Sequence, residues 1–238
     1  MRACESVLQE MIELKNDKQK IVLQRFFKTG KGQYGEGDVF LGIKVPQTRI
    51  VAKQYWQKCT FNDLDTLIQS PYHEVRLVAL LILVQLFKHD PSNKLYAEFY
   101  LAHTSFINNW DLVDLSCYEI LGRWLMDKDR SVLYNLALNG KTFWEQRIGM
   151  VSCMTFVRND QFDDCLAIAD ILLHHPHDLI QKAVGWLLRE VGKRDSDRLN
   201  DFLASRYKTM PRTMLRYAIE KYPDTIRRKF LNGTFVKQ

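Results

Sequence analysis

Polar side chains recur at one position of four similar segments of the chain. The segments read HEVRLVALLILV from residue 73, WDLVDLSCYEIL from 110, WEQRIGMVSCMT from 144 and HDLIQKAVGWLL from 177. Each has a polar start followed by an apolar, helix-like stretch. Three of the recurring side chains are cations, which hold phosphates through charge and counterion release. The recurring residues are Arg76, Asp114, Arg147 and Lys182, spaced 38, 33 and 35 apart.

Asp114 is the one acid in this row, and a carboxylate opposes phosphate binding. One chemical role for it is to meet positive charge that develops on a bound partner. The oxocarbenium sugar formed during N-glycosidic cleavage is such a charge, and a carboxylate can stabilise it and hold a water. The alternative is an ion pair with Arg147 or Arg76 on a neighbouring helix. The residue pattern alone leaves both roles open.

Two tryptophans accompany these polar positions. Trp110 precedes Asp114 by four residues, so both lie on one face of a helix. Indoles beside cations and an acid suggest a cleft that holds a cationic base or a sugar by aromatic contact. Packing in the core or at its rim is the alternative for each indole. A second shared face is formed by Lys182, Trp186, Arg189 and Lys193.

The elements that must position these residues are helices. Strand-like alternation is almost absent, and five of the six prolines stand where helices of roughly 10–16 residues would begin. A period in the mid-thirties is typical of HEAT-like or TPR-like repeats, and the Trp/Gly/Tyr pattern of TPR repeats is missing. The sequence predicts an all-α, right-handed solenoid of HEAT-like helical repeats with a concave basic cleft. We expect one domain over residues 1–238, with a Gly-rich loop at 30–42.

Composition and charge narrow the class of protein. The chain has 238 residues, of which 46% are apolar and 26% charged, which excludes a mainly disordered chain. The net charge is +6, but residues 1–180 carry −2 and residues 181–238 carry +8. A positive field at one end suits DNA or RNA, and a solvated basic face is the alternative.

The sequence indicates no membrane-spanning segment, no disulfide and no metal site. The longest apolar run, residues 77–84, is far shorter than the roughly 20 residues that span a bilayer. No secretory signal is visible, and the five cysteines are odd in number and contain no CxxC pair. The HHPH stretch at 174–177 fits no standard metal-site spacing. We expect a reduced, cytoplasmic protein without metal or cofactor.

Several motifs resemble the AlkD-type DNA alkylation repair family. They are NNWDLVDLS (108–116), WEQRIG (144–149), QKAVGWLLREVGK (181–193), FLGIKVPQTR (40–49) and HEVRLVAL (73–80). The resemblance covers roughly residues 20–222, and the WDxVD and GWxLRE motifs together are fairly specific. It implies a curved solenoid that holds duplex DNA on its concave face. Active members are glycosylases that release cationic N3- and N7-alkylated purines without a cofactor and without a base-flipping pocket.

The resemblance also implies roles for single residues. Asp114 takes the place of the catalytic carboxylate, Trp110 that of its aromatic partner, and Trp186 that of the third member of the site. Arg147 matches a phosphate-contacting position and Arg189 a backbone contact. Arg76, Lys182 and Lys193 join the expected DNA-binding set through the polar row and the shared face described above. We therefore expect a monomer that binds double-stranded DNA, whether alkylated, distorted or branched.

The Gly-rich stretch departs from the family pattern. Active members have a short amphipathic helix before the LGI segment, where this chain reads KTGKGQYGEGDVFLGI. Each glycine disfavours a helix by roughly 1 kcal/mol, so a loop or small hairpin is expected. The stretch lacks the GK[ST] ending of a phosphate-binding loop and carries Glu36 and Asp38. Two further functions stay open: a catalytically weak or inactive reader of branched or distorted DNA, and a scaffold whose basic end binds an acidic protein.

Overall fold

The computed structural model describes residues 2–236, and helices form nearly all of its regular structure. This confirms the predicted all-α class. Within those residues the sole β-type pairing is an isolated bridge between Val39 and Tyr72. The helices form two compact units, Met1–Ser116 and Cys117–Gln238. No helix of residues 2–236 is long and apolar enough to cross a bilayer.

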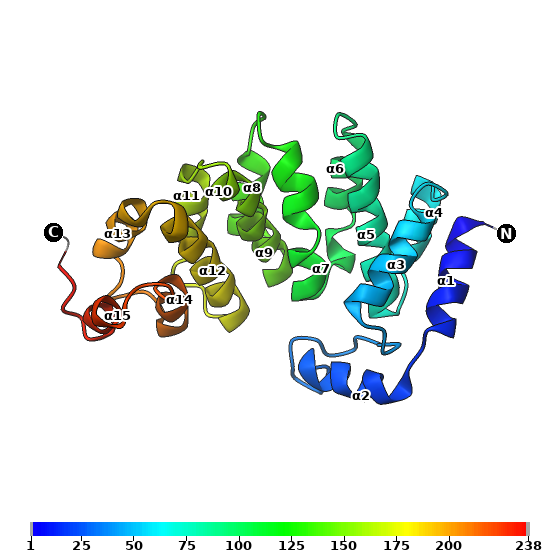
Figure 1. The fold of residues 1–238 in the computed structure, drawn as a ribbon, viewed down its shortest axis with the longest axis horizontal. Helices are drawn as coiled ribbons and strands as arrows, with labels where there is room; N and C mark the ends of the chain where they lie inside the picture. Colours follow the sequence, from blue (N-terminus) through cyan, green and yellow to red (C-terminus); the bar gives the residue numbers. More distant parts are fainter. Residues whose placement is uncertain (1, 237–238) are drawn as a thin grey trace. The chain divides into compact units, whose positions relative to one another are not determined.

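The first unit is built around one long apolar helix, α5 (Figure 1). Its run from Val75 to Val84 is buried throughout, because helices pack against more than one of its faces. These neighbours are α1, α3, α4, α6 and α7. The helices of this unit are α1 (Ala3–Glu13), α2 (Asp17–Phe26), α3 (Val45–Tyr55), α4 (Phe61–Ile68), α5 (His73–His89), α6 (Leu95–Ala102), the 3₁₀ turn η1 (Thr104–Phe106) and α7 (Trp110–Asp114).

The second unit is centred on α12, whose buried stripe contacts helices on several sides. It packs most extensively against α14, and also against α9, α10, α11 and α13. The helices of this unit are the π-helical segment η2 (Tyr118–Gly122), α8 (Ser131–Asn139), α9 (Phe143–Ser152), α10 (Met154–Arg158), α11 (Asp163–Ile171), α12 (Asp178–Arg194), α13 (Ser196–Ala204), α14 (Arg212–Ala218) and α15 (Asp224–Leu231).

Polar contacts in the structure repeat with the period seen in the sequence. In the second unit Asp163 and Arg198, 35 residues apart, form an ion pair, and Asp170 pairs with Arg206 at a spacing of 36. Equivalent positions in successive helical pairs are therefore neighbours, as a repeat protein requires. The structure is compatible with the predicted helical repeat.

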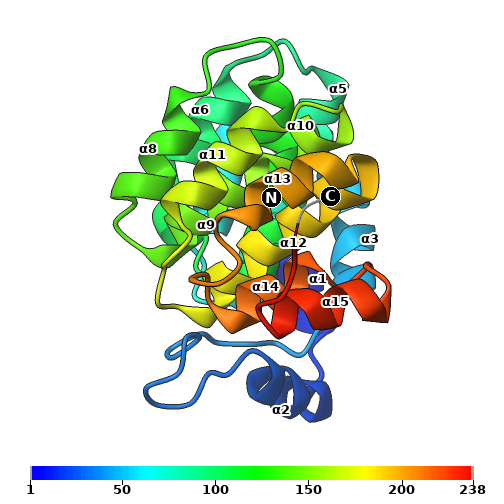
Figure 2. The ribbon, with the colours of Figure 1, turned by 90° about the vertical axis from the view of Figure 1, so that its left-hand side faces the viewer.

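α2 and the loop after it stand apart from the packed helices of the first unit. Figures 1 and 2 both show them off the ends of α1 and α3. α2 has no buried residue, and Ile21, Val22 and Phe26 are exposed. Asn16 caps its first turn by accepting a hydrogen bond from the backbone N–H of Gln19 at 2.9 Å. Residues 28–37 form mainly turns, and residues 38–44 are irregular apart from the bridge at Val39.

Candidate active site

A hollow of about 390 Å³ opens among the helices of the first unit. Its walls come from α2, the loop, α3, α5 and α7, and they are mainly apolar. Trp110 and Asp114 both line it, so their four-residue spacing does place them on one surface. The lining residues are Leu23, Phe26, Phe27, Phe40, Ile43, Lys44, Val45, Pro46, His73, Glu74, Leu77, Trp110, Asp111, Asp114 and Leu115.

α7 is the short helix that presents these two side chains. The amide of Asn109, which is fully buried, starts α7 by accepting a hydrogen bond from the Trp110 N–H at 2.9 Å. Asp114 is its last residue and is partly exposed. The chain then turns and enters η2 (Tyr118–Gly122) instead of continuing as the single helix expected from 110. π-helical turns are frequent at functional sites.

Behind the hollow, His73 joins two carboxylates that are far apart in the sequence. Its Nδ1 lies 2.8 Å from Asp38 Oδ2, and its Nε2 lies 2.9 Å from Asp111 Oδ2. All three side chains are buried. Asp38 also accepts a hydrogen bond from the guanidinium of Arg76. Because both imidazole nitrogens face carboxylate oxygens, both must carry a proton, so His73 is an imidazolium.

The charges around His73 set its protonation. Burial alone would lower the pKa of His73, but the charge and hydrogen bond of Asp111, followed by those of Asp38, raise it to about 9. Burial would raise the pKa of Asp38, and His73 together with Arg76 outweighs this and lowers it. This buried set ties the loop, through Asp38, to the helix that carries Trp110 and Asp114.

Glu74 holds the far end of the loop in the same way. Its carboxylate accepts hydrogen bonds from the backbone N–H groups of Leu41, Gly42 and Ile43 at 2.9, 2.8 and 3.1 Å. Gly42 has φ of +89°, and a Cβ there would collide with the carbonyl oxygen of Asn16. Glycine is therefore required where the loop passes α2. The loop is a fixed part of the site's wall.

Aromatic rings form one side of the hollow. Phe27 stacks on Trp110 with ring centroids 5.2 Å apart, and the exposed Phe26 meets Trp110 edge-on at 5.8 Å. Phe40 stacks on the His73 ring at 4.4 Å. The preferred geometries of such pairs add about 0.5–1.5 kcal/mol each beyond burial. This packing fixes the indole of Trp110 beside Asp114.

Two cations of the predicted DNA-binding row are buried. Arg76 is 5% exposed and donates to Asp38, to Asn108 and to the carbonyl oxygens of residues 70 and 71. Arg147 is also 5% exposed and donates to the carbonyl oxygen of Leu179. These contacts give both guanidinium groups structural partners inside their own units. Phosphate binding by either arginine stays a prediction, and this burial weighs against it.

The remaining predicted residues lie together on α12 in the second unit. Trp186 is partly exposed there. Lys182 pairs with Asp178 at 2.8 Å, Lys193 pairs with Glu190 at 2.7 Å, and Arg189 pairs with Glu220. Each pair has one exposed partner, and ion pairs at the surface are worth little. DNA contact by this face stays a prediction.

The chain has a second basic region, which the comparison of net charge before and after residue 180 did not reveal. Residues 15–58 contain ten Lys and Arg against three Asp and Glu. The structure puts this basic excess on α2, the loop and α3, and of these cations Lys44 lines the hollow. Arg25, Lys44 and Arg49 are exposed there. A shorter charge window would have shown it.

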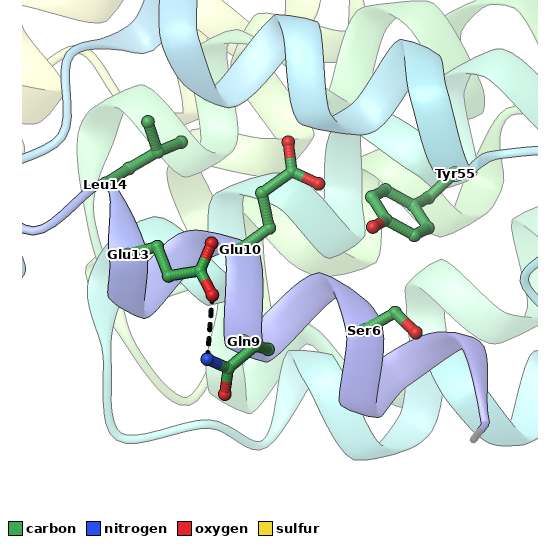
Figure 3. Close-up of a pocket in the computed structure, with 6 residues that line it drawn as sticks. All are labelled: Ser6, Gln9, Glu10, Glu13, Leu14 and Tyr55. Atoms are coloured by element: carbon green, nitrogen blue, oxygen red, sulfur yellow. Dashed lines mark hydrogen bonds between the residues drawn. The ribbon is translucent and has the colours of Figure 1, made fainter.

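Other polar clusters of the chain have a different character. A shallow hollow between α1 and α3 is lined by Glu10, Glu13 and Tyr55, and Gln9 donates to Glu13 at 2.8 Å (Figure 3). Its carboxylates would repel a phosphodiester.

In the HHPH stretch, the His177 ring caps α12 and stacks on a phenylalanine at 4.0 Å, which is a structural use of that histidine.

The fold and this site define an all-α protein of repeated helical pairs. A solved structure titled "Predicted DNA alkylation repair enzyme from Enterococcus faecalis" matches with a TM-score of 0.69 at 18% identity, over 88% of this chain and 97% of that chain. At that identity the likeness concerns the fold alone. The DNA alkylation repair enzyme family matches residues 7–222, and the chain therefore belongs to this family. No curated protein sequence matches it.

Proposed function

We propose that the protein is a DNA glycosylase that releases cationic N3- and N7-alkylated purines from duplex DNA. The observation that carries this proposal is the placement of Asp114 beside Trp110 on one hollow. Family membership supports DNA as the partner. We also propose that the protein acts as a monomer and as one domain, and that Trp186 contributes to its activity.

Cleavage of the N-glycosidic bond of an alkylated purine requires only a few catalytic groups. An alkylated purine is positively charged, so it leaves readily with the electron pair of the C1′–N bond, which cancels its charge. Water adds to C1′, and its proton passes to Asp114 and then to solvent. The carboxylate of Asp114 stabilises the sugar cation while the bond breaks, which is the electrostatic catalysis expected of a preorganised charge.

The exposed part of the first unit supplies a surface for the duplex. Arg25, Lys44 and Arg49 carry positive charge for the phosphates, and the apolar side chains of α2 lie among them. Apolar wedges beside cations are typical of proteins that bind and distort the minor groove. α2 is thus a short helix that comes before the loop predicted from the sequence.

Release of free base tests the proposal. Duplex DNA methylated at N7 of guanine and N3 of adenine is incubated with the wild type, with Asp114→Asn, and with Asp127→Asn as a control. Asp127 is exposed and is not among the residues that line the hollow. The wild type and the control should release both bases above the spontaneous rate, and Asp114→Asn should not. Equal release by all three variants would refute the role of Asp114.

A second candidate is a reader of branched or distorted DNA with weak or no excision. It is favoured by the rigid attachment of the Gly-rich loop through Asp38 and Glu74 beside the exposed face of α2. Under this function Asp114→Asn would leave DNA binding unchanged or strengthen it. A branched duplex would also bind more tightly than a linear one of equal length.

A further inference from the structure

We propose that Arg216 and Tyr217 of α14 bind the phosphate backbone of DNA. Within the same proposal, Glu220 is the counterion that holds Arg189 until a phosphate replaces it. The inference rests on the DNA partner of the proposed function, and it adds to that function two binding residues and one competing carboxylate. All four residues lie in the second unit, on α12, on α14 or directly after α14.

α12 and α14 pack side by side and run in the same direction (Figures 1 and 2). Gly185 of α12 lies against Tyr217, and one turn further along both helices Arg189 is paired with Glu220. A Cβ on Gly185 would come within 2.5 Å of a carbonyl oxygen of α14 and of the Tyr217 Cβ. Because residue 185 has no side chain, the two helices approach closely. This brings Tyr217 next to the turn of α12 that carries Trp186.

Tyr217 presents its side chain to solvent rather than to the core. It is 36% exposed, and Trp186 on the neighbouring helix is partly exposed as well. The Tyr217 hydroxyl has no hydrogen-bond partner within residues 2–236. Tyrosine hydroxyl groups are among the side-chain donors that bind the phosphate oxygens of DNA. The Tyr217 hydroxyl can therefore donate to a phosphate that lies along α14.

Arg216 stands next to Tyr217 and differs from the other cations of this surface. Lys182, Arg189 and Lys193 each pair with a carboxylate. Arg216 is exposed, and no carboxylate of the described residues lies within ion-pair distance of it. Its guanidinium can therefore donate two parallel hydrogen bonds to a phosphate, which is the geometry that arginine favours.

Glu220 is a carboxylate placed among the cations that follow α14. It accepts a hydrogen bond from the guanidinium of Arg189, and its other oxygen lies 3.2 Å from Lys221 Nζ. The hydrogen bond of Lys221, followed by the charge of Arg189, lowers the pKa of Glu220, so this carboxylate is ionised at neutral pH. A phosphate that binds Arg189 must displace Glu220 or lie beside it, and like charges repel. Glu220 therefore opposes DNA binding, and its removal should strengthen it.

Fluorescence anisotropy with a labelled, unmethylated duplex measures binding separately from excision. Arg216→Ala should weaken binding about tenfold, as expected for a lost hydrogen bond between charged groups, and Tyr217→Phe, which removes only the hydroxyl, should weaken it less. Arg216→Ala should also reduce the log–log slope of affinity against salt by roughly 0.9. Glu220→Gln should tighten binding about two- to fivefold, the range that a surface ion pair covers.

The substitutions of charged residues have matched controls in the same unit. Arg198→Ala removes an exposed arginine of α13, which is paired with an aspartate. Asp170→Asn removes the carboxylate that pairs with Arg206 at 2.6 Å, as Glu220 pairs with Arg189. Both controls should bind the duplex like the wild type, and circular dichroism shows which variants are folded. In an Arg189→Ala background, Glu220→Gln should bring no gain in affinity.

The results that would overturn each part are distinct. Wild-type affinity in folded Arg216→Ala and Tyr217→Phe would overturn the phosphate contacts. An affinity of Glu220→Gln no higher than that of the wild type, or a gain that persists without Arg189, would overturn the role of Glu220. Changes of equal size in Arg198→Ala and Asp170→Asn would show an effect of net charge alone and overturn both parts.

The surface and the glycosylase also fail separately. The expected changes in duplex affinity, without release of methylated bases by the wild type, would keep the surface and overturn the glycosylase. Release of methylated bases by the wild type, with unchanged duplex affinity in Arg216→Ala and Tyr217→Phe, would keep the glycosylase and overturn the surface.

Discussion

Replacement of His73 by glutamine removes the imidazolium that joins Asp38 to Asp111. Gln is neutral and of similar length, so it retains a polar group between the carboxylates but not the charge. The pKa of His73 is raised from 6.5 to about 9 by these partners. At 1.36 kcal/mol per pKa unit, the charged form adds roughly 3 kcal/mol to the free energy of unfolding.

The sign of the pH dependence follows from the direction of this shift. Because the folded-state pKa is higher than that of the unfolded chain, the stabilisation is fully present below about pH 6.5. It is lost as the pH rises through about 9. The charged groups that contact the ring are Asp38 from the loop and Asp111 from α7, and Arg76 of α5 in turn donates to Asp38.

Urea unfolding at pH 6, 7.5 and 9.5 measures this effect. The difference in unfolding free energy between the wild type and His73→Gln should be largest at pH 6 and shrink by roughly 3 kcal/mol at pH 9.5. Other groups that titrate near pH 9 cancel in the difference. His89→Gln, at an exposed histidine that ends α5, is the control and should show no such trend. A difference that is constant between pH 6 and 9.5 would refute an imidazolium at His73.

Three further outcomes are expected. Gly42→Ala should lower the free energy of unfolding by roughly 3 kcal/mol, because φ is positive there and the new Cβ would collide with Asn16. Gly37→Ala, at a position with positive φ but open space, should lower it by about 1 kcal/mol. Equal losses in urea unfolding would contradict the collision. The five cysteines are buried, and burial followed by a nearby aspartate raises the pKa of Cys59 to about 11, so a thiol reagent at pH 8 should modify them only after unfolding. Duplex affinity should fall steeply with salt, and Arg49→Ala should reduce the log–log slope by roughly 0.9; an affinity independent of salt would point instead to an acidic protein as the partner.

Local spacing predicted the part of the site that lies on one helix. Trp110 and Asp114 are four residues apart, and a single helical turn suffices to bring them to one surface. The repeat was also predictable from spacing, because its period appears in the pattern of polar and apolar residues along the sequence. The burial of α5 likewise follows from its continuous apolar run, because a surface helix has one polar face.

The connection between Asp38, His73 and Asp111 could not be predicted from local spacing. Their spacings, 35 and 38, match the repeat period, but the position compared along the repeats was that of Arg76. Whether Arg76 turns to solvent or to the preceding loop depends on its partner Asp38. That partner lies in a glycine-rich segment whose path no periodic pattern defines.

α2 has no buried stripe, so the apolar pattern of the sequence did not define its bounds. Its apolar residues Ile21, Val22 and Phe26 face solvent, so the periodicity that marks a core-facing helix is weak. The signal that remains is the start of the helix, where Asn16 precedes Asp17. The Gly-rich loop that follows was predictable from composition, but its attachment through Glu74 required the structure.

Single-turnover release of 7-methylguanine from a duplex tests the role of Asp114 most directly. We expect the wild type and Asp127→Asn to release the base at the same rate, well above the spontaneous rate. Asp114→Asn should fall to the spontaneous rate while it binds the same duplex as tightly as the wild type. Release by Asp114→Asn at the wild-type rate would show that this carboxylate does not act on the sugar cation.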